Sequence, residues 1–413
     1  MREMKDSGIE WIGAIPQDWQ LSKIGSLYTQ RNEKVSDKDY QPLSVTMQGI
    51  LPQLATAAKT DDGDNRKLVR VGDFAINSHS DRRGSCGISP LDGSVSLINI
   101  ILTPRTAMHP GYYNWLFHTT LFADEFYKWG HGIVADLWTT RWQEMKSITV
   151  PVPEYAEQER IAAFLDAECA EIDTVLEKTR ASIEEYKKLK QAVITQAVTK
   201  GIRGDRPMKN SGIEWIGEIP AEWDVIRVKQ LLKERNERSK EGKEEPLSMS
   251  QKVGLVPTKF LESIPNMASS FVGAKLAYVD DLVFNKLKAH LGVFSVSRYD
   301  GLVSPDYAVY CSTGKSNLKY LEYIFKTPQC IGEFRKKSTG IAAGLMRLYT
   351  EGLFSIYLPY PALSEQEEIA EYLNEKCAGI DALIAKKQQY LTEIENYKKS
   401  LIYEYVTGKK EVV

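Results

Sequence analysis

Apolar residues recur at steps of four and three along two long stretches of the chain, 156–199 and 364–406. Neither stretch contains proline, and Gly379 is their only glycine. Eight of the ten seam positions are apolar in each stretch. Such spacing, sustained over five heptads, predicts two coiled-coil helices. The seam positions of the first are Leu165, Cys169, Ile172, Leu176, Thr179, Ile183, Tyr186, Lys190, Val193 and Ala197, and adding 208 to each number gives those of the second.

Charge is sorted along both predicted helices. Residues 157–177 contain seven acids and one base, whereas residues 178–200 contain six bases and two acids, and the second helix repeats the trend. Antiparallel pairing would set each acidic half against a basic half, so we expect it. Complementation of each helix dipole alone is the simpler alternative. Lys190 and Lys398 interrupt the two seams at equivalent places; they either fix the register or, as we favour, extend to solvent.

The chain is a two-fold internal repeat. SGIEWIGAIPQDW from Ser7 matches SGIEWIGEIPAEW from Ser211, and AEQERIAAFL from Ala156 matches SEQEEIAEYL from Ser364. The intervening parts share only a skeleton, in which Asn77 corresponds to Asn285. Two modules with one fold and different surfaces are what two readers of different ligands would require.

Between these segments, short β-rich runs alternate with turn signals. We expect strands at 68–76, 94–102, 277–284 and 308–311, and helices at 112–127 and 318–335. Pro151-Val152-Pro153 and Pro359-Tyr360-Pro361 mark the boundary between each module and its helix. Asn77 and Asn285, each at a strand end, are interpreted as turn residues.

Composition bounds the possible functions. Hydrophobic residues make up 43% and charged residues 26%, and no apolar run approaches the roughly 20 residues of a membrane span. The first residues lack the apolar core of a signal peptide, so we expect a cytoplasmic protein. The five cysteines form no zinc-ligand spacing. A net charge of −2 is unlike that of a protein that simply coats DNA, so any DNA-binding charge must be sorted onto one region.

Four features together resemble one known family: the duplicated SGIEWIGxIPxxW, the GDFAIN and DDLVFN runs leading to a DG turn, the Pro-x-Pro segment, and the SEQEEIAEYL-type opening of a long helix. The sequence resembles the specificity (S) subunits of type I restriction–modification systems over nearly its whole length. It departs from the usual pattern after the first DG, where Ser94-Val95-Ser96-Leu97 replaces the more typical Leu302-Val303-Ser304-Pro305.

The resemblance implies an α/β protein in which two similar target-recognition modules are held apart by two long helices forming an antiparallel coiled coil, with pseudo-two-fold internal symmetry. The expected parts are target-recognition domain 1 at 1–154, a central spacer helix at 155–200, target-recognition domain 2 at 201–362 and a C-terminal spacer helix at 363–408. A helix of about 43 residues spans roughly 65 Å, so the pair would set a fixed separation between the modules.

The family also implies the partners. Each module would read one half of a bipartite target in double-stranded DNA. The helices would bind two methyltransferase (M) subunits that carry S-adenosylmethionine, and restriction (R) subunits would bring ATP and Mg²⁺. The chain itself would hold no cofactor and catalyse nothing.

The residues permit DNA binding. Residues 224–360 contain 20 Lys and Arg against 14 Asp and Glu, whereas residues 20–152 contain 14 against 13. Candidate contacts are side chains suited to phosphates or base edges in loops after the aligned asparagines and in the glycine-rich segments. They are Ser78, His79, Arg82, Arg83, His131, Thr139, Thr140 and Arg141 in the first module, and Lys286, Lys288, His290, Lys336, Lys337, Ser338, Thr339 and Arg347 in the second.

Two other functions compete with DNA recognition. Thr313-Gly314-Lys315-Ser316 ends like a phosphate-binding P-loop, but Val309 stands where the motif requires glycine. No methylation, zinc-protease or serine-hydrolase motif was found, and the histidines lack a second metal ligand at suitable spacing, so we expect neither catalytic nor metal-binding residues. A protein-binding coiled-coil scaffold that does not read DNA is the alternative function.

Overall fold

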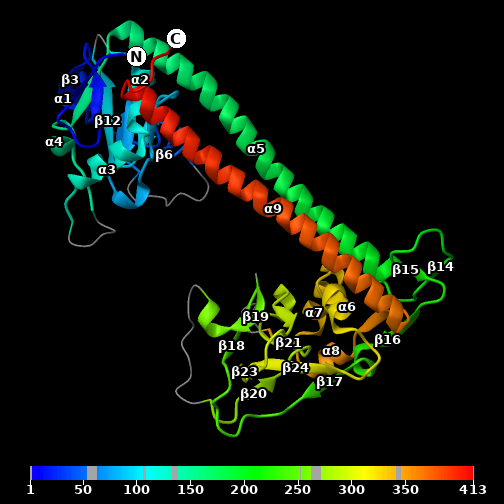
Figure 1. Cartoon of the computed structure of the whole chain (residues 1–413). Coiled ribbons are helices and arrows are strands. Elements are labelled where there is room, and N and C mark those ends of the chain that lie inside the picture. The colour runs from blue at the N-terminus through cyan, green and yellow to red at the C-terminus, as the bar shows by residue number, and fades with distance from the viewer. Residues whose placement is uncertain are drawn as a thin grey trace. The chain divides into compact units, whose positions relative to one another are not determined.

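The computed structural model describes residues 2–53, 63–105, 108–132, 138–251, 253–261, 271–340 and 346–412. The chain divides into two compact units, unit 1 with Met1–Arg180 and Gln388–Val413, and unit 2 with Ala181–Lys387. Each unit contains one module together with one part of each long helix. These helices are α5 (Tyr155–Lys200) and α9 (Leu363–Val406), and both lie within one residue of the coiled-coil stretches predicted at 156–199 and 364–406 (Figure 1).

Unit 1 is built on a four-stranded antiparallel sheet in the order β10-β9-β12-β4. A three-stranded sheet, β11-β8-β5, and the pairs β1-β2, β6-β7 and β3-β13 accompany it. The strands are β1 (Met4–Asp6), β2 (Ala14–Pro16), β3 (Gln20–Lys23), β4 (Tyr28–Arg31), β5 (Lys34–Val35), β6 (Leu43–Thr46), β7 (Gly49–Pro52), β8 (Arg66–Val69), β9 (Phe74–Asn77), β10 (Cys86–Ile88), β11 (Gly93–Val95), β12 (Asn99–Pro104) and β13 (Thr149–Val152). The helices are α1 (Ile24–Leu27), η1 (Ser80–Arg82), α2 (Pro110–Phe117), α3 (Thr120–Lys128) and α4 (Trp142–Met145).

Unit 2 repeats this plan with the sheet β17-β24-β21-β22, whose strands correspond in order to β4, β12, β9 and β10. Its strands are β14 (Met208–Asn210), β15 (Glu218–Pro220), β16 (Asp224–Arg227), β17 (Leu232–Arg235), β18 (Leu247–Ser250), β19 (Gly254–Pro257), β20 (Lys275–Ala277), β21 (Leu282–Asn285), β22 (Phe294–Val296), β23 (Gly301–Val303), β24 (Tyr307–Ser312) and β25 (Tyr357–Tyr360). Its helices are η3 (Val228–Gln230), η4 (Thr258–Phe260), η5 (Ala289–Leu291), α6 (Leu318–Phe325), α7 (Pro328–Lys337) and α8 (Thr350–Phe354). The predicted mixed α/β fold with one plan in both modules is confirmed.

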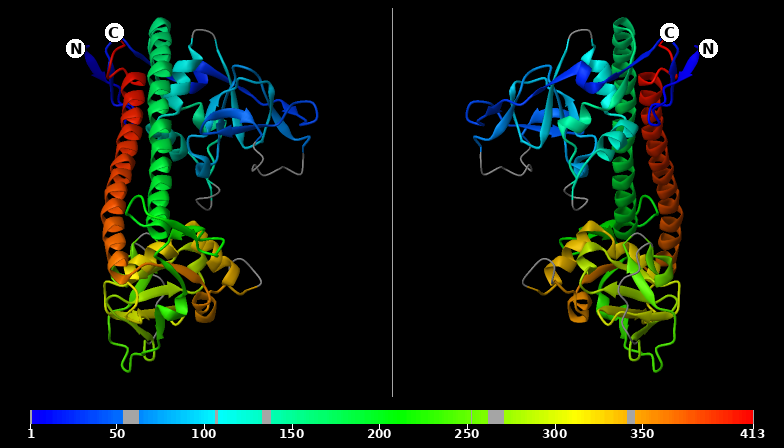
Figure 2. Two further views of the ribbon diagram at one scale, coloured as in Figure 1. Left: turned by 90° about the vertical axis from the view of Figure 1, so that its right-hand side faces the viewer. Right: turned by 90° about the vertical axis from the view of Figure 1, so that its left-hand side faces the viewer.

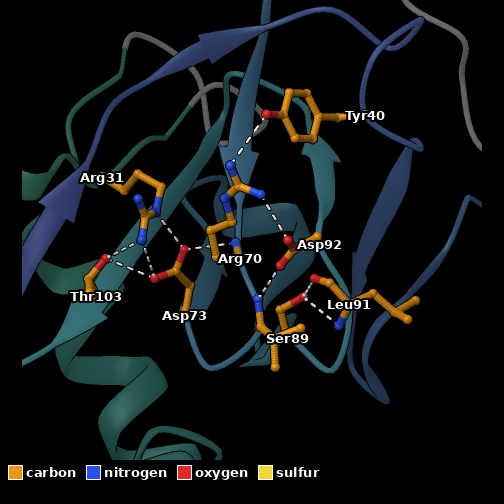
Figure 3. A network of polar contacts seen from close by, with 9 residues as sticks. Arg31, Tyr40, Arg70, Asp73, Ser89, Leu91, Asp92 and Thr103 are labelled. Carbon is orange, nitrogen blue, oxygen red and sulfur yellow. Dashed lines mark hydrogen bonds and ion pairs between the residues drawn. The ribbon is translucent and has the colours of Figure 1, made fainter.

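The predicted strand at 68–76 is wrong, because a turn divides it into β8 and β9. Figure 3 shows how carboxylates hold this turn. Asp73 accepts the backbone N–H of Arg70 at 2.9 Å, and Asp92 accepts that of Val71 at 2.8 Å. Arg31 in turn donates to Asp73 at 2.6 Å. Gly72 has a φ of 86°, a conformation that glycine adopts without steric cost.

The second module carries the same turn, so the predicted strand at 277–284 is also two strands, β20 and β21. Asp281 accepts the backbone N–H of Tyr278 at 2.9 Å, and Asp300 accepts that of Val279 at 2.7 Å. Asp280 occupies the place of Gly72 with a φ of 65°. The strand at 94–102 is likewise divided into β11 and β12, whereas the strand at 308–311 lies within β24 as predicted.

Each predicted module helix is also divided in two. Residues 112–127 fall in α2 and α3, and Thr119 caps the second of these by accepting the backbone N–H of Phe122 at 3.2 Å. Residues 318–335 fall in α6 and α7, where Thr327 accepts the N–H of Cys330 at 3.3 Å and Pro328 stands at the first turn. Threonine caps and a helix-starting proline favour a new helix over a continued one.

The large side chains at the centre of each module pack directly on the long helices. In unit 1 the buried cluster joins Trp19, Tyr112 and Phe117 with Leu165 of α5 and Leu401 of α9. The corresponding cluster of unit 2 joins Trp223, Tyr320 and Phe325 with Ala197 and Leu373. Module and helices therefore share one core within each unit.

A hydrogen-bonded helix mount fixes the first turn of each long helix to its module. In unit 1 the mount consists of Trp19, Glu157 and Gln158. The Trp19 indole N–H donates to Glu157 at 2.9 Å. The buried Gln158 accepts the backbone N–H of His109 at 2.8 Å and donates to the carbonyl of Pro153 at 2.8 Å.

The mount of unit 2 has the same geometry with Trp223, Glu365 and Gln366. Trp223 donates to Glu365 at 2.9 Å, and Gln366 bridges the N–H of Asn317, at 3.0 Å, and the carbonyl of Pro361, also at 3.0 Å. The two best-preserved segments of the repeat thus contact one another in both units.

Ion pairs show that α5 and α9 run in opposite directions within each unit. In unit 1, Asp173 pairs with Lys398 at 2.6 Å and, further along α5, Arg180 pairs with Glu395 at 2.6 Å. In unit 2, Lys190 pairs with Asp381 at 2.5 Å, and Arg203, just after the end of α5, pairs with Glu368 at 2.7 Å. In both units the two helices lie side by side (Figure 2). The antiparallel pairing predicted from charge is confirmed.

Lys190 and Lys398 have a different role from the one that we favoured. Lys398 contacts Asp173, and the equivalent Lys190 of unit 2 contacts Asp381 at 2.5 Å. Each lysine therefore pairs with a particular residue of the opposite helix instead of simply extending to solvent. All other seam positions of both helices are buried or half-buried. The separation that the helices set between the modules stays a prediction.

Among the described residues, no helix is both long enough and apolar enough to span a membrane.

Candidate nucleic-acid interface

A shared backbone frame brings the two candidate loops of each module together. In unit 1, His131 and Thr139 exchange two backbone hydrogen bonds of 3.0 and 3.1 Å, and the N–H of Thr140 donates to the carbonyl of Ser78 at 3.0 Å. In unit 2, Thr339 and Arg347 exchange bonds of 3.0 and 2.8 Å. The N–H of Leu348 there donates to the carbonyl of Lys286 at 3.0 Å.

All of these positions are related by the repeat offset of 208 residues. We call this arrangement the loop frame. Residues 133–137 and 341–345, between the paired backbone positions, lie outside the described residues.

The two aligned asparagines form turns at the start of this frame, as predicted. The Asn77 side-chain oxygen accepts the N–H of His79 at 3.0 Å. That of Asn285 accepts the N–H of Leu287 at 3.1 Å. These side chains hold the backbone that carries the candidates, which favours a positioning role over contact with a ligand.

Two candidates of the first module are buried and serve the frame. Ser78 donates to the carbonyl of Ile98, and Thr140 donates to that of Phe126 at 2.8 Å. Both hydroxyls are thus committed to the backbone. Their geometry favours positioning of the loops over contact with DNA.

The other candidates of the first module are exposed or half-buried, and most of their charges are paired. Arg83 pairs with Asp124 and lies over the Tyr127 ring at 5.5 Å. Arg82 lies 3.4 Å from Asp81, and His131 lies 3.8 Å from Glu144. Exposed pairs of this kind contribute little, so Arg82 and Arg83 can exchange a carboxylate for a phosphate at small cost.

His79 and Thr139 form a backbone bridge beside the same frame. Arg141 is exposed at the end of the hairpin, where its backbone N–H donates to Glu144 at 3.1 Å. The frame therefore brings His79, His131 and Thr139 together, with Arg82, Arg83 and Arg141 on the segments next to them.

Unit 2 places its candidates differently. Lys288 is exposed, and Lys286 is half-buried and donates to the carbonyl of Pro305 at 3.2 Å. Burial, reinforced by Lys275, lowers the pKa of Lys286 below its ordinary value. His290 is buried, and its Nδ1 atom has no hydrogen-bond partner among the described residues.

The remaining candidates of unit 2 follow the end of α7. Lys336 pairs with Glu333 at 2.7 Å, and Lys337 is exposed in the last turn. Ser338 donates to the carbonyl of Phe334 at 2.7 Å. Thr339 then begins the hairpin that carries Arg347.

Sequence reasoning missed two side chains at these frames. Trp138 is 37% exposed, and its indole N–H donates to the carbonyl of Tyr127 at 2.7 Å. A Cβ on Gly130 would lie 2.2 Å from the Trp138 ring, so the glycine makes room for the indole. Asp306 in unit 2 lies 3.4 Å from Arg347. An aromatic residue in a glycine-rich segment is a signal in the sequence, whereas nothing in it connects Asp306 with Arg347.

Among the described residues, no group of three or more His, Cys, Asp or Glu side chains is arranged to hold a metal ion. The loop frames instead offer hydrogen-bond donors and cations on exposed loops, which is the chemistry that duplex DNA requires of a protein surface.

No family model matches the sequence, but comparison with known proteins finds relatives. The chain is 23% identical over 428 aligned residues to the type I restriction enzyme MjaVIII specificity subunit of Methanocaldococcus jannaschii, covering 96% of this chain and 94% of that protein. It is 22% identical over 294 residues to the EcoDI specificity subunit of Escherichia coli, covering 64% of this chain and 63% of that protein.

Solved structures show the same fold. A chain from work on complex assembly and conformational transition of the type I R–M system has a TM-score of 0.73 at 13% identity, over 96% of this chain and 99% of that chain. The HsdS subunit from Thermoanaerobacter tengcongensis has a TM-score of 0.53 at 15% identity, over 96% of this chain and 98% of that one. The arrangement of two modules and two long helices is thus found in other chains at nearly full length.

Proposed function

This chain is a homologue of the specificity subunits of type I restriction enzymes, as its motifs predicted, and we propose that it recognises a bipartite DNA sequence for such an enzyme. Each module reads one half-site in double-stranded DNA. The chain positions catalytic partners and performs no catalysis of its own. Its place of action is then the cytoplasm, where these partners meet DNA.

One observation carries the proposal: both modules use the same loop frame but present different side chains on it. The backbone bonds of Ser78 and Thr139 recur at Lys286 and Arg347, whereas the side chains change from hydroxyls to cations. A protein that reads two different half-sites needs this combination, because the frame fixes the approach to the groove while the side chains select the bases.

The long helices supply a second surface for partners. Exposed apolar residues recur every seven positions on α9 at Leu383, Tyr390 and Tyr397, which are 45%, 48% and 54% exposed. On α5, Val175 and Leu189 occupy two of the three equivalent positions, and the middle one is Ser182. Apolar stripes at helical spacing suit docking of further helices.

We therefore propose that these stripes bind two methyltransferase subunits that carry S-adenosylmethionine. Restriction subunits would then join the complex with ATP and Mg²⁺. The equivalence of the stripes on α5 and α9 supports two copies of the methyltransferase subunit.

The scaffold alternative is not favoured, since the curated relatives are specificity subunits. Affinity for duplex DNA separates the two functions. We expect the complex with methyltransferase subunits to bind DNA with an affinity that falls steeply with salt, whereas a protein-binding scaffold would show none of this dependence.

Exchange of one module tests the proposal directly. Residues 224–360 are replaced by the corresponding module of another specificity subunit, and methylated adenines are mapped in DNA exposed to the assembled methyltransferase. We expect the wild-type complex to modify two different half-sites at fixed spacing, and the exchange to change only one of them. Alteration of both half-sites, or of neither, would contradict the assignment of one module to one half-site.

A further inference from the structure

Two cations of the loop frame in unit 2, Lys286 and Arg347, replace Ser78 and Thr139 of unit 1, whereas a third cation close to them, Lys275, corresponds to Lys67. Lys286 and Arg347 adjoin on the loop frame, and the buried Lys275 lies near Lys286. Glu234 binds Lys275 at 3.3 Å, and Asp306 lies 3.4 Å from Arg347. The three cations thus outnumber the two carboxylates that face them, which leaves this part of the frame positive.

The backbone of Arg347 is held on both sides. Its N–H and carbonyl are both bonded to Thr339, and the next residue, Leu348, donates to the carbonyl of Lys286. Leu348 is itself buried. The Cα–Cβ direction of Arg347 is therefore fixed by Thr339 and by the bond from Leu348 to Lys286, directly after β21, unlike that of an arginine on a free loop.

The guanidinium of the Arg347 side chain is held by one contact, and its terminal end is exposed. Its Nη2 atom contacts Asp306, and its Nε atom is buried without a hydrogen-bond partner among the described residues. The side chain is nevertheless 41% exposed. Because Nε is covered, the terminal amino groups form the exposed end of the guanidinium.

Two adjacent terminal N–H groups in a fixed plane match the two acceptors O6 and N7 that guanine presents in the major groove. Resting on the proposed function, we infer that Arg347 reads a guanine in the half-site of the second module. Asp306 is the positioning residue that orients the guanidinium, and Lys286 adds positive charge beside it.

A phosphate contact would not need an arginine whose backbone is bonded on both sides and whose guanidinium is oriented by a carboxylate. Phosphate binding requires a charge near the backbone, which Lys336 and Lys337 supply at the exposed end of α7. Discrimination between bases requires a side chain of fixed position and orientation. In the first module Thr139 and Ile98 replace Arg347 and Asp306, so the half-site of that module lacks this contact.

The test uses the full chain assembled with its methyltransferase subunits and a duplex library randomised at both half-sites. The variants are Arg347→Gln, Arg347→Lys and Asp306→Asn, and Lys336→Gln is the matched control. Selection and sequencing give the base preference at every position, and binding at several salt concentrations gives the salt slope. Thermal unfolding shows which variants fold.

We expect the wild-type half-site of the second module to contain a guanine whose discrimination falls roughly ten- to hundred-fold in Arg347→Gln. Arg347→Lys keeps the charge but not the planar fork, so it should retain affinity and lose the same preference. Asp306→Asn should weaken the preference without changing the salt slope. Lys336→Gln should lower affinity for all sequences alike and leave every preference intact.

The inference is wrong if folded Arg347→Gln keeps every base preference, or if its affinity falls uniformly as in the control. It is also wrong if the half-site contains no guanine on either strand. Methylation without any bipartite preference by the wild-type complex would instead contradict the proposed function, and the inference with it.

Discussion

At the scale of single residues, the loops of both modules depend on side chains that bond to the backbone. Asp73 and Asp281 terminate strands, Asn77 and Asn285 form turns, and Ser78 anchors a loop by bonding to Ile98. Such contacts fix the Cα positions of the candidate residues. The side chains that make these contacts are committed to the backbone, and the remaining ones are available for a ligand.

Substitution of Gly72 measures the conformational strain that the turn between β8 and β9 imposes on a residue other than glycine. Its φ is 86°, and a Cβ there would meet no atom within 4 Å, so Gly72→Ala should destabilise the protein by conformational strain alone, about 1 kcal/mol. Gly332 in α7 is the control, since it also has open space but lacks the positive φ, and Gly332→Ala should stabilise the protein by about 0.5–1 kcal/mol. Urea unfolding measures both, and effects of equal sign would contradict this account.

The sequence predicted the residue types of the interface better than their roles. Hydroxyls and cations were expected in the loops, but burial of Ser78 and Thr140 depends on carbonyls of Ile98 and Phe126, which are remote in sequence. Likewise, the contact between Arg347 and Asp306 joins residues 41 positions apart. Pairings of this kind arise from the sheet and cannot be read from local pattern.

At the scale of elements, long regular patterns were predicted well and short ones were not. The two coiled-coil helices end within one residue of expectation because five heptads average out local exceptions. The single strands predicted at 68–76 and 277–284 fail because apolar residues stand on both sides of Gly72-Asp73 and Asp280-Asp281, where the turns lie. What breaks these strands is the bonding of the Asp73 and Asp281 carboxylates to the backbone N–H three residues earlier, a local turn contact that has no periodicity.

The ion pair between Lys398 and Asp173 should stabilise the pairing of α5 with α9 in unit 1. In Lys398→Glu the new carboxylate faces Asp173, and in Asp173→Lys two lysines meet, so we expect each to cost about 1 kcal/mol of unfolding free energy. The double variant should recover most of that loss because the pair is restored with reversed sign. Unfolding of the four proteins forms a double-mutant cycle.

Lys399→Glu, at an exposed neighbouring position outside the seam, is the control and should show no coupling to Asp173→Lys. If the effects of Lys398→Glu and Asp173→Lys simply add, the pair does not set the register of the helices.

At the scale of the whole molecule, the two modules differ in charge more than in fold. Residues 224–360 carry 20 Lys and Arg against 14 Asp and Glu, while residues 20–152 carry 14 against 13. The net charge of −2 for the full chain conceals this difference, since acidic residues of the long helices offset the cations of the second module. The second module is therefore expected to make more phosphate contacts than the first.

This asymmetry predicts a difference in salt dependence between the half-sites. With the assembled methyltransferase, a duplex bearing only the second module's half-site should lose affinity with salt more steeply than one bearing only the first module's half-site. Each phosphate contact adds about 0.9 to the magnitude of the salt slope. With about two more phosphate contacts in the second module, we expect the two slopes to differ by roughly two. Anisotropy titrations between about 50 and 200 mM salt measure this. A duplex without either half-site is the reference, and equal slopes would show that the charges of the second module lie away from DNA.

The helix mounts have a consequence for how such a protein acquires a new target. Trp19 with Glu157 and Trp223 with Glu365 join the flanks of each module, and those flanks are the parts of the chain that both halves have in common. Genetic exchange between the flanks would replace one whole module by a foreign one, and the residues of the helix mount would still match. On the proposed function, half of the recognised sequence would then change in one step, while the helix surfaces proposed to bind partner subunits stay the same.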